Sequence, residues 1–283
     1  MPATSNSRLL GLARPWIERQ LGFKLPDRTT SPVTIVRGLE GSAGAAPLMA
    51  FRIDSLSVAS VRPGWLRGIQ AVFDRLHPDQ IFSVLGTYEL SRVTLPDGVA
   101  VWGPIPNYLA DSTTWRPVDD DRPVLLTPDQ FAAVDWKVFW HCDRNSPIAS
   151  FGIYDDGRED DRDSRKLVAL ATVADHGDSI WEIGVDVAPE NKGRRLGSAV
   201  VSAAGNWILE HGAVIHATVA FWNTPSSRNM RSLGMEYVFS VMRGREGPFH
   251  VPPQPLGTPL PNTEIFDTYP RWAMNPDIRP RPD

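Results

Sequence analysis

A basic, glycine-containing turn carries the residues of this chain best suited to bind an anion. It reads KGRRLGS and consists of Lys192, Gly193, Arg194, Arg195, Leu196, Gly197 and Ser198. A helix begins inside the turn, because apolar residues recur at helical spacing from Leu196 until Gly212 ends the run. Free backbone N–H groups and the helix dipole favour an anion at such a helix start, typically a phosphate. The alternative is a solvated basic turn that only begins the helix.

The stretch before the turn supplies a candidate base. Its apolar residues alternate with Glu182, Gly184 and Asp186, which predicts a strand with one buried face that Pro189 ends. Glu182 is the first candidate, because a carboxylate partly shielded by Trp181 and by a bound acyl group would have a raised pKa, as a base working near neutrality needs. Its alternative role is a structural ion pair, and Asp186 is a weaker candidate base.

This strand–turn–helix resembles the GNAT superfamily of acyl-CoA N-acyltransferases, whose signature is Arg/Gln-x-x-Gly-x-Gly/Ala. Lys192 and Gly197 stand at its first and last positions, and Arg195 replaces the middle glycine. A second segment, NTPSSRNMRSLGM at 223–235, is similar to the family's Asn-x-x-Ala/Ser and Leu-Gly-Phe/Met elements. The resemblance covers about 126–244. The rival phosphate motif G-x-x-x-x-G-K-[ST] does not occur in the chain.

The resemblance implies an acyl-CoA co-substrate, acetyl-CoA or CoA, with the 192–198 turn around its pyrophosphate. Val185 and Val187 would offer backbone groups to the pantetheine arm. Asn223 would meet the same arm and Ser226 the phosphates, although both are also suited to capping a helix. Arg228 is an alternative phosphate ligand or an exposed helix residue. The resemblance also implies Glu182 as the base that deprotonates the acceptor amine.

The family's proton-donating tyrosine aligns with Met230, which cannot donate a proton. Three alternatives remain for the departing thiolate: water, a hydroxyl such as that of Ser227 or Tyr237, or no acid at all. Several tryptophans, Trp136 and Trp140 among them, are suited to the core or an interface. Trp136, Trp140 and Trp181 are also candidates for the walls of the acceptor groove.

The pattern of elements predicts an α+β fold with a mixed, mostly antiparallel GNAT-type sheet, split at a bulged strand. We expect an additional N-terminal α+β domain at 1–110, which could be a degenerate GNAT-like half. A polar linker follows at 111–125, then the GNAT domain at 126–246 and a proline-rich tail at 247–283. Two further expectations are a helix over 128–139 and a short strand over 90–94.

Composition limits the partners and the compartment. The chain has 283 residues and a formal net charge of −4, which gives no reason to expect nucleic-acid binding. One cysteine, Cys142, cannot form an internal disulfide and fits a reducing compartment, so we expect a cytoplasmic protein. No signal peptide, membrane span or metal motif is expected. We expect a monomer or homodimer.

Three functional hypotheses follow. The first is transfer of an acetyl or short acyl group from acetyl-CoA to an amine of a small molecule or peptide. The second is a non-catalytic CoA-binding module of the same fold, and the third is a purely structural α/β protein.

Overall fold

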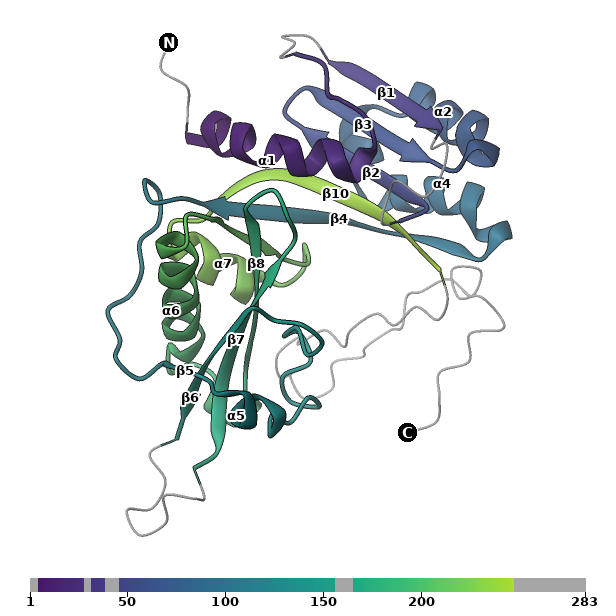
Figure 1. The fold of residues 1–283 in the computed structure, drawn as a ribbon. Helices are drawn as coiled ribbons and strands as arrows, with labels where there is room; N and C mark the ends of the chain where they lie inside the picture. Colours follow the sequence, from purple (N-terminus) through teal and green to yellow (C-terminus); the bar gives the residue numbers. More distant parts are fainter. Residues whose placement is uncertain (1–4, 28–31, 39–45, 156–164, 247–283) are drawn as a thin grey trace, which may run out of the picture.

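The ten strands of the described chain form one sheet, in the order β1-β3-β2-β10-β4-β9-β8-β7-β6-β5 (Figure 1). The computed structural model describes residues 5–27, 32–38, 46–155 and 165–246. The strands are β1 (Val33–Gly38), β2 (Leu48–Ile53), β3 (Leu56–Val61), β4 (Val99–Ala110), β5 (Val124–Leu125), β6 (Ala149–Tyr154), β7 (Leu167–Asp175), β8 (Ile180–Val187), β9 (Val214–Thr218) and β10 (Glu236–Glu246). Two neighbouring pairs, β1–β3 and β8–β9, are parallel, and the others are antiparallel. The predicted mixed, mostly antiparallel sheet is confirmed.

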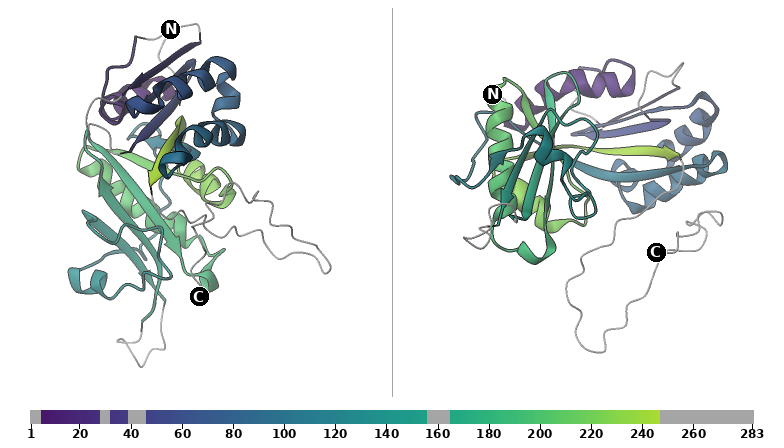
Figure 2. Two further views of the ribbon diagram at one scale, coloured as in Figure 1. Left: turned by 90° about the vertical axis from the view of Figure 1, so that its right-hand side faces the viewer. Right: turned by 60° about the horizontal axis from the view of Figure 1, so that its bottom comes forward.

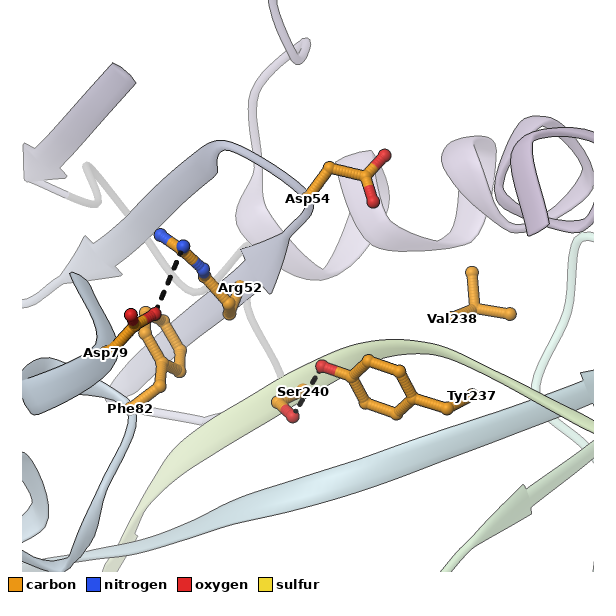
Figure 3. A pocket seen from close by; sticks show the side chains of 7 residues that line it. All are labelled: Arg52, Asp54, Asp79, Phe82, Tyr237, Val238 and Ser240. Carbon is orange, nitrogen blue, oxygen red and sulfur yellow. Dashed lines mark hydrogen bonds and ion pairs between the residues drawn. The ribbon is translucent and has the colours of Figure 1, made fainter. Parts of the chain in front are cut away.

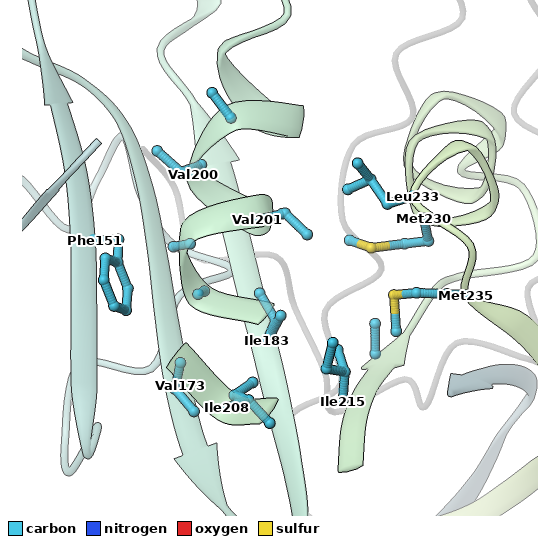
Figure 4. Close-up of a cluster of buried hydrophobic side chains, with 14 of the residues drawn as sticks. Phe151, Val173, Ile183, Val200, Val201, Ile208, Ile215, Met230, Leu233 and Met235 are labelled. Atoms are coloured by element: carbon cyan, nitrogen blue, oxygen red, sulfur yellow. The ribbon is translucent and has the colours of Figure 1, made fainter. Parts of the chain in front are cut away.

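Helices cover both faces of the sheet. They are α1 (Ser5–Leu21), α2 (Leu66–Arg75), α3 (Pro78–Ile81), α4 (Val84–Thr94), α5 (Pro128–Ala132), α6 (Leu196–Glu210) and α7 (Thr224–Ser232). Alternation along β2 assigns the faces, because Met49 and Phe51 pack in the core of α1 while Leu48 and Ala50 pack in the core of α2 and α4. The helix α6 lies between the strands and the side chains of α7 in a third core (Figure 4).

Two long strands connect the parts of the sheet. β4 pairs with β10 on one side and with β9 on the other, so a strand from the first 110 residues lies between two strands from the predicted GNAT domain. Figure 2 shows both long strands crossing from one group of helices to the other. Strands from before and after the predicted 111–125 linker therefore pair with each other in one sheet. The division into domains stays a prediction.

That linker is held against α6 and α7 in the structure. The Arg116 N–H donates to the carbonyl of Leu233 at 2.9 Å, and the Trp115 indole donates to Asn206 Oδ1 at 2.9 Å. Gly234 ends α7 with a φ of +83°, and a Cβ there would lie 1.9 Å from the Thr114 carbonyl oxygen. The glycine of the Leu-Gly pair in the second segment is thus explained by the structure, because only glycine fits this close approach of the two backbones.

Two local predictions were wrong. The strand expected at 90–94 is the end of α4, because Gly86, Leu90 and Thr94 are buried at helical spacing. The helix expected over 128–139 ends at Ala132. Beyond it the carboxylate of Asp135 accepts from the Lys137 N–H at 3.0 Å, a local turn that competes with helix continuation. The predicted tail at 247–283 lies outside the described residues.

Candidate active site

The sheet opens between β8 and β9. These parallel strands pair only at Ile180–Val214, Trp181–Ile215 and Glu182–His216. β9 then ends at Thr218, while β8 continues to Val187 in its ladder with β7. That ladder has no register shift, so the predicted split is confirmed but the predicted bulge in β8 is wrong. The second half of β8 therefore has β7 on one side and an opening on the other.

Backbone groups of two predicted residues point toward this opening. The Ala188 N–H donates to the Val168 carbonyl, and the His176 N–H donates to the Ile180 carbonyl, which fixes the hydrogen-bonded pairs of the β7–β8 ladder. Because such pairs alternate along an antiparallel ladder, Val185 and Val187 direct their N–H and C=O groups away from β7. An extended ligand at the opening could pair with them as an added strand.

The basic turn precedes α6 and is open to solvent. Its four residues from Lys192 to Arg195 are exposed. The first hydrogen bond inside the helix joins the Ala199 N–H to the Arg195 carbonyl at 3.2 Å. The N–H groups of Leu196, Gly197 and Ser198 thus have no acceptor within the helix and are available to an anion.

Arg195 keeps the backbone conformation that favours a glycine. Its φ is +59° and its ψ is +16°, in the left-handed region, and Gly193 nearby has a φ of +83°. A non-glycine residue there costs on the order of 1–3 kcal/mol, so the surrounding structure must stabilise the turn. Arg195 thus adopts at this position the conformation that a glycine would adopt, and its guanidinium is exposed beside the turn.

Three other residues predicted to contact a cofactor form hydrogen bonds within the protein. The hydroxyl of Ser198 donates to Asn229 Oδ1 of α7 at 2.6 Å. The side chain of Asn223 accepts the Ser226 N–H at 3.2 Å and caps α7. The capping role considered for Asn223 is thus present, with the Ser226 backbone N–H as its donor, and the contacts of both residues with a cofactor stay predictions. Arg228 is exposed on the same helix.

Glu182 lies at the last residue pair before the opening, and both of its carboxylate oxygens are occupied. His176 Nε2 is 2.6 Å from Oε2, and the Thr218 hydroxyl donates to Oε1 at 2.5 Å. Burial alone would raise the pKa of this carboxyl. The hydrogen bonds and the nearby imidazoles of His176 and His216 outweigh it and lower the pKa of Glu182 to about 2. The expected raised pKa is therefore wrong.

Trp181 does not shield Glu182, because neighbouring strand residues point to opposite faces of the sheet. The Trp181 ring stacks on Trp207 of α6, with centroids 5.4 Å apart. Trp136 instead contacts Phe131 edge-on, and the half-exposed Trp140 packs against His141. The three tryptophans predicted as groove walls thus do not pack together.

A cluster of polar groups around Glu182 was missed by sequence reasoning. His176 comes from the hairpin between β7 and β8, and His216 comes from β9. The His216 ring is buried, with Nε2 at 2.8 Å from Asn107 Oδ1 and Nδ1 without a partner among the described residues. Burial lowers the pKa of His216 to about 4, although the Glu182 carboxylate opposes this. Only the His176 contact had a sequence signal, because a short hairpin brings residues 176 and 182 diagonally together.

Asp186 forms a second histidine–carboxylate pair on the same face of β8. Its Oδ1 is 2.6 Å from His141 Nδ1, and its Oδ2 accepts the His141 backbone N–H at 2.6 Å. Gly184 lies between the two pairs, where a Cβ would be 2.7 Å from the His141 carbonyl oxygen. The glycine therefore lets the 141–142 backbone approach the strand closely.

The hydroxyls considered as replacements for the missing tyrosine are both bonded. Met230 is buried in the core of α6. Ser227 Oγ is 2.9 Å from the hydroxyl of Tyr108, which β4 places two strands from β8. Tyr237 bonds Ser240 at 3.0 Å. Tyr108 is thus a further hydroxyl beside α7, and no motif in the sequence pointed to it.

A polar pocket of about 370 Å³ lies between β2, β10 and α3 (Figure 3). Its walls include the Arg52–Asp79 ion pair at 3.3 Å and Tyr237. None of the residues predicted to bind a cofactor lines this pocket, so it is separate from the opening at β8.

The described residues form no group of three or more side chains suited to a metal ion. Cys142 is buried, and burial raises the pKa of its thiol, so it is a poor nucleophile. Within the same residues, no helix combines the length and the apolar character required to cross a membrane.

Comparisons with known proteins give structural matches alone. No protein-family model matches the chain, and no curated protein matches it. Among solved structures, an acetyltransferase from the GNAT family of Novosphingobium aromaticivorans matches with 19% identity and a TM-score of 0.43, over 52% of this chain and 66% of its own. A GCN5-related N-acetyltransferase from Kribbella flavida matches with 18% identity and a TM-score of 0.44, over 72% of this chain and 88% of its own. A tandem GNAT protein from the clavulanic acid biosynthesis pathway matches with 16% identity and a TM-score of 0.38, over 56% and 59%.

The chain thus spans just under two thirds of the first of these structures. All three identities are below 25% and all three TM-scores are below 0.5, so the matches are a similarity alone. The α+β architecture expected from the sequence rests on the sheet of the structure itself. The likeness says nothing of the reaction or the acceptor.

Proposed function

We propose that this protein is an N-acyltransferase that moves an acetyl or short acyl group from acetyl-CoA to an amine of a small molecule or peptide. The opening beside β8, which leads directly into the basic turn before α6, carries the proposal. An acyl-CoA needs both features in succession, an extended edge for the pantetheine and free N–H groups for the pyrophosphate.

The residues at the opening suit the steps of amine acylation. The neutral amine attacks the thioester carbonyl, a C–N bond forms, and the C–S bond breaks to release the CoA thiolate. Backbone N–H groups of β8 can donate to the oxyanion, since those of Val185 and Val187 face the opening. The Glu182 carboxylate and the neutral His176 imidazole, 2.6 Å apart, are the groups here that can accept the amine proton.

A non-catalytic CoA-binding module is the second candidate. Two observations favour it: Met230 is buried in the core where the family has a tyrosine, and both oxygens of Glu182 are already hydrogen-bonded. A thiolate is a good leaving group, so the missing tyrosine is compatible with catalysis.

Two measurements separate these candidates from a purely structural protein and from each other. A rise in melting temperature with acetyl-CoA is expected for both and would be absent for a purely structural protein. Thiol release from acetyl-CoA, screened over small amines and peptides, is expected only of the enzyme. Binding without thiol release would favour the second candidate.

The remaining sequence predictions belong to this proposal. The acceptor class stays open between small amines and peptides. A cytoplasmic monomer or homodimer, with no nucleic-acid, membrane or metal requirement, is the form in which we expect the protein to act.

A further inference from the structure

We propose that His176 takes the proton of the acceptor amine and that Glu182 is the positioning residue which orients it. This rests on the proposed acyl transfer, and it replaces Glu182 as the proton acceptor. Each Glu182 oxygen already accepts one hydrogen bond, from Thr218 or from His176, and these bonds make the carboxylate less basic. The imidazole, by contrast, keeps one nitrogen without a partner among the described residues.

The Glu182 carboxylate determines which nitrogen of the His176 ring can accept a proton. An ionised carboxylate can only accept, so His176 Nε2 must be the donor across the 2.6 Å contact. The neutral ring then carries its lone pair on Nδ1. Its side chain is 38% exposed, against 24% for that of Glu182, so the ring is the more accessible of the two.

The backbone around His176 is held in place by α1. Arg19 donates to the His176 carbonyl and pairs with Asp178 at 2.7 Å. The hairpin turn closes with the Ile180 N–H donating to the Gly177 carbonyl at 3.0 Å. The hydrogen bonds to the His176 backbone and to its Nε2 restrict the rotation of the ring, as a positioned base requires.

The proton balance is simple. As the C–N bond forms, one amine proton moves to Nδ1, and the ring becomes an imidazolium paired with the Glu182 carboxylate. The C–S bond breaks and CoA leaves as the thiolate. The extra proton on His176 then passes to water or to the thiolate, which restores the neutral ring.

Several charged groups face His176 and together raise its pKa above the ordinary value. The Glu182 hydrogen bond is the largest contribution, and desolvation opposes it. The other groups are Asp175 on β7, which raises the pKa, and Arg243 on β10, which lowers it, with the His216 ring of β9 at 6.3 Å. Because the ring must be neutral to accept a proton, the rate should rise with pH through this raised pKa.

The test compares three variants of the full chain: H176Q, E182Q and the control H211Q, a histidine at the end of α6. Thiol release is measured against pH with acetyl-CoA and an amine found in the screen. H176Q should lower the rate by ~10²–10⁴, the usual range for a general base, while acetyl-CoA affinity stays near wild type. E182Q should lower it less and move the pH profile toward acid, because the carboxylate no longer raises the imidazole pKa. H211Q should match wild type.

Two further readouts exclude a structural role. Free imidazole should restore part of the rate to H176A, and the imidazole resonance of His176 should titrate at lower pH in E182Q. Full activity of H176Q, or an E182Q loss as large as that of H176Q with an unmoved pH profile, would overturn the assignment alone. If the wild type binds acetyl-CoA but releases no thiol with any amine, the proposed function fails and this assignment falls with it.

Discussion

Replacing Lys192 and Arg194 together by alanine tests whether the turn before α6 binds the pyrophosphate of acetyl-CoA. Both side chains are exposed, and neither forms an ion pair among the described residues. They are therefore free to meet an anion, and their loss should leave folding almost unchanged.

The magnitude follows from their exposure. A hydrogen bond to a charged group contributes about 1.5–3 kcal/mol, and solvent screening at an exposed site reduces this to about 1–1.5 kcal/mol each. The double variant should therefore lose about 2–3 kcal/mol, a roughly 30- to 150-fold rise in Kd. Binding should not vanish, because the N–H groups of Leu196, Gly197 and Ser198 remain.

Calorimetric titration with acetyl-CoA at low and high salt is the assay. The wild-type affinity should fall with salt, and the double variant should show a weaker salt dependence, since two cations are gone. The matched control is the double variant R67A/K137A, which removes two exposed cations from other parts of the surface. Equal affinity in the turn variant and the control would refute the assignment of the turn.

Three further predictions concern the backbone and a buried histidine. Arg195→Gly should keep acetyl-CoA affinity within about threefold, whereas Arg195→Val should weaken it about tenfold or more in the same titration, because a branched Cβ disfavours the φ of +59°. In urea unfolding, Gly234→Ala should cost ~3 kcal/mol or more, because its Cβ would meet the Thr114 carbonyl, whereas Gly212→Ala, with φ +75° and open space, should cost only ~1 kcal/mol. Between pH 6.5 and about 4, stability should fall by ~3 kcal/mol as pH falls, because unfolded His216 binds a proton that the folded form excludes. His216→Gln should flatten this slope in acid unfolding curves, and an unchanged slope would show that another group is responsible.

The sequence by itself determined the local elements that build the candidate site. Alternation predicted β8, helical spacing predicted α6, and Gly212 predicted where α6 ends, because each signal lies within one element. The basic turn between them could be predicted as well, because its residues are consecutive in the sequence. Glycine at position 234 also had its structural counterpart, a left-handed residue that ends α7.

Tertiary structure alone decided which residues meet at the opening. The insertion of β4 between β9 and β10 joins residues more than 100 positions apart, as in the contact of Asn107 with His216. No local period encodes such a pairing.

The pKa of Glu182 has the same origin. The pKa of Glu182 is lowered by His176 from a hairpin and by Thr218 and His216 from β9. The sequence placed only Trp181 beside Glu182. Trp181 faces the other side of the sheet, so burial was outweighed by hydrogen bonds that only the assembled strands provide.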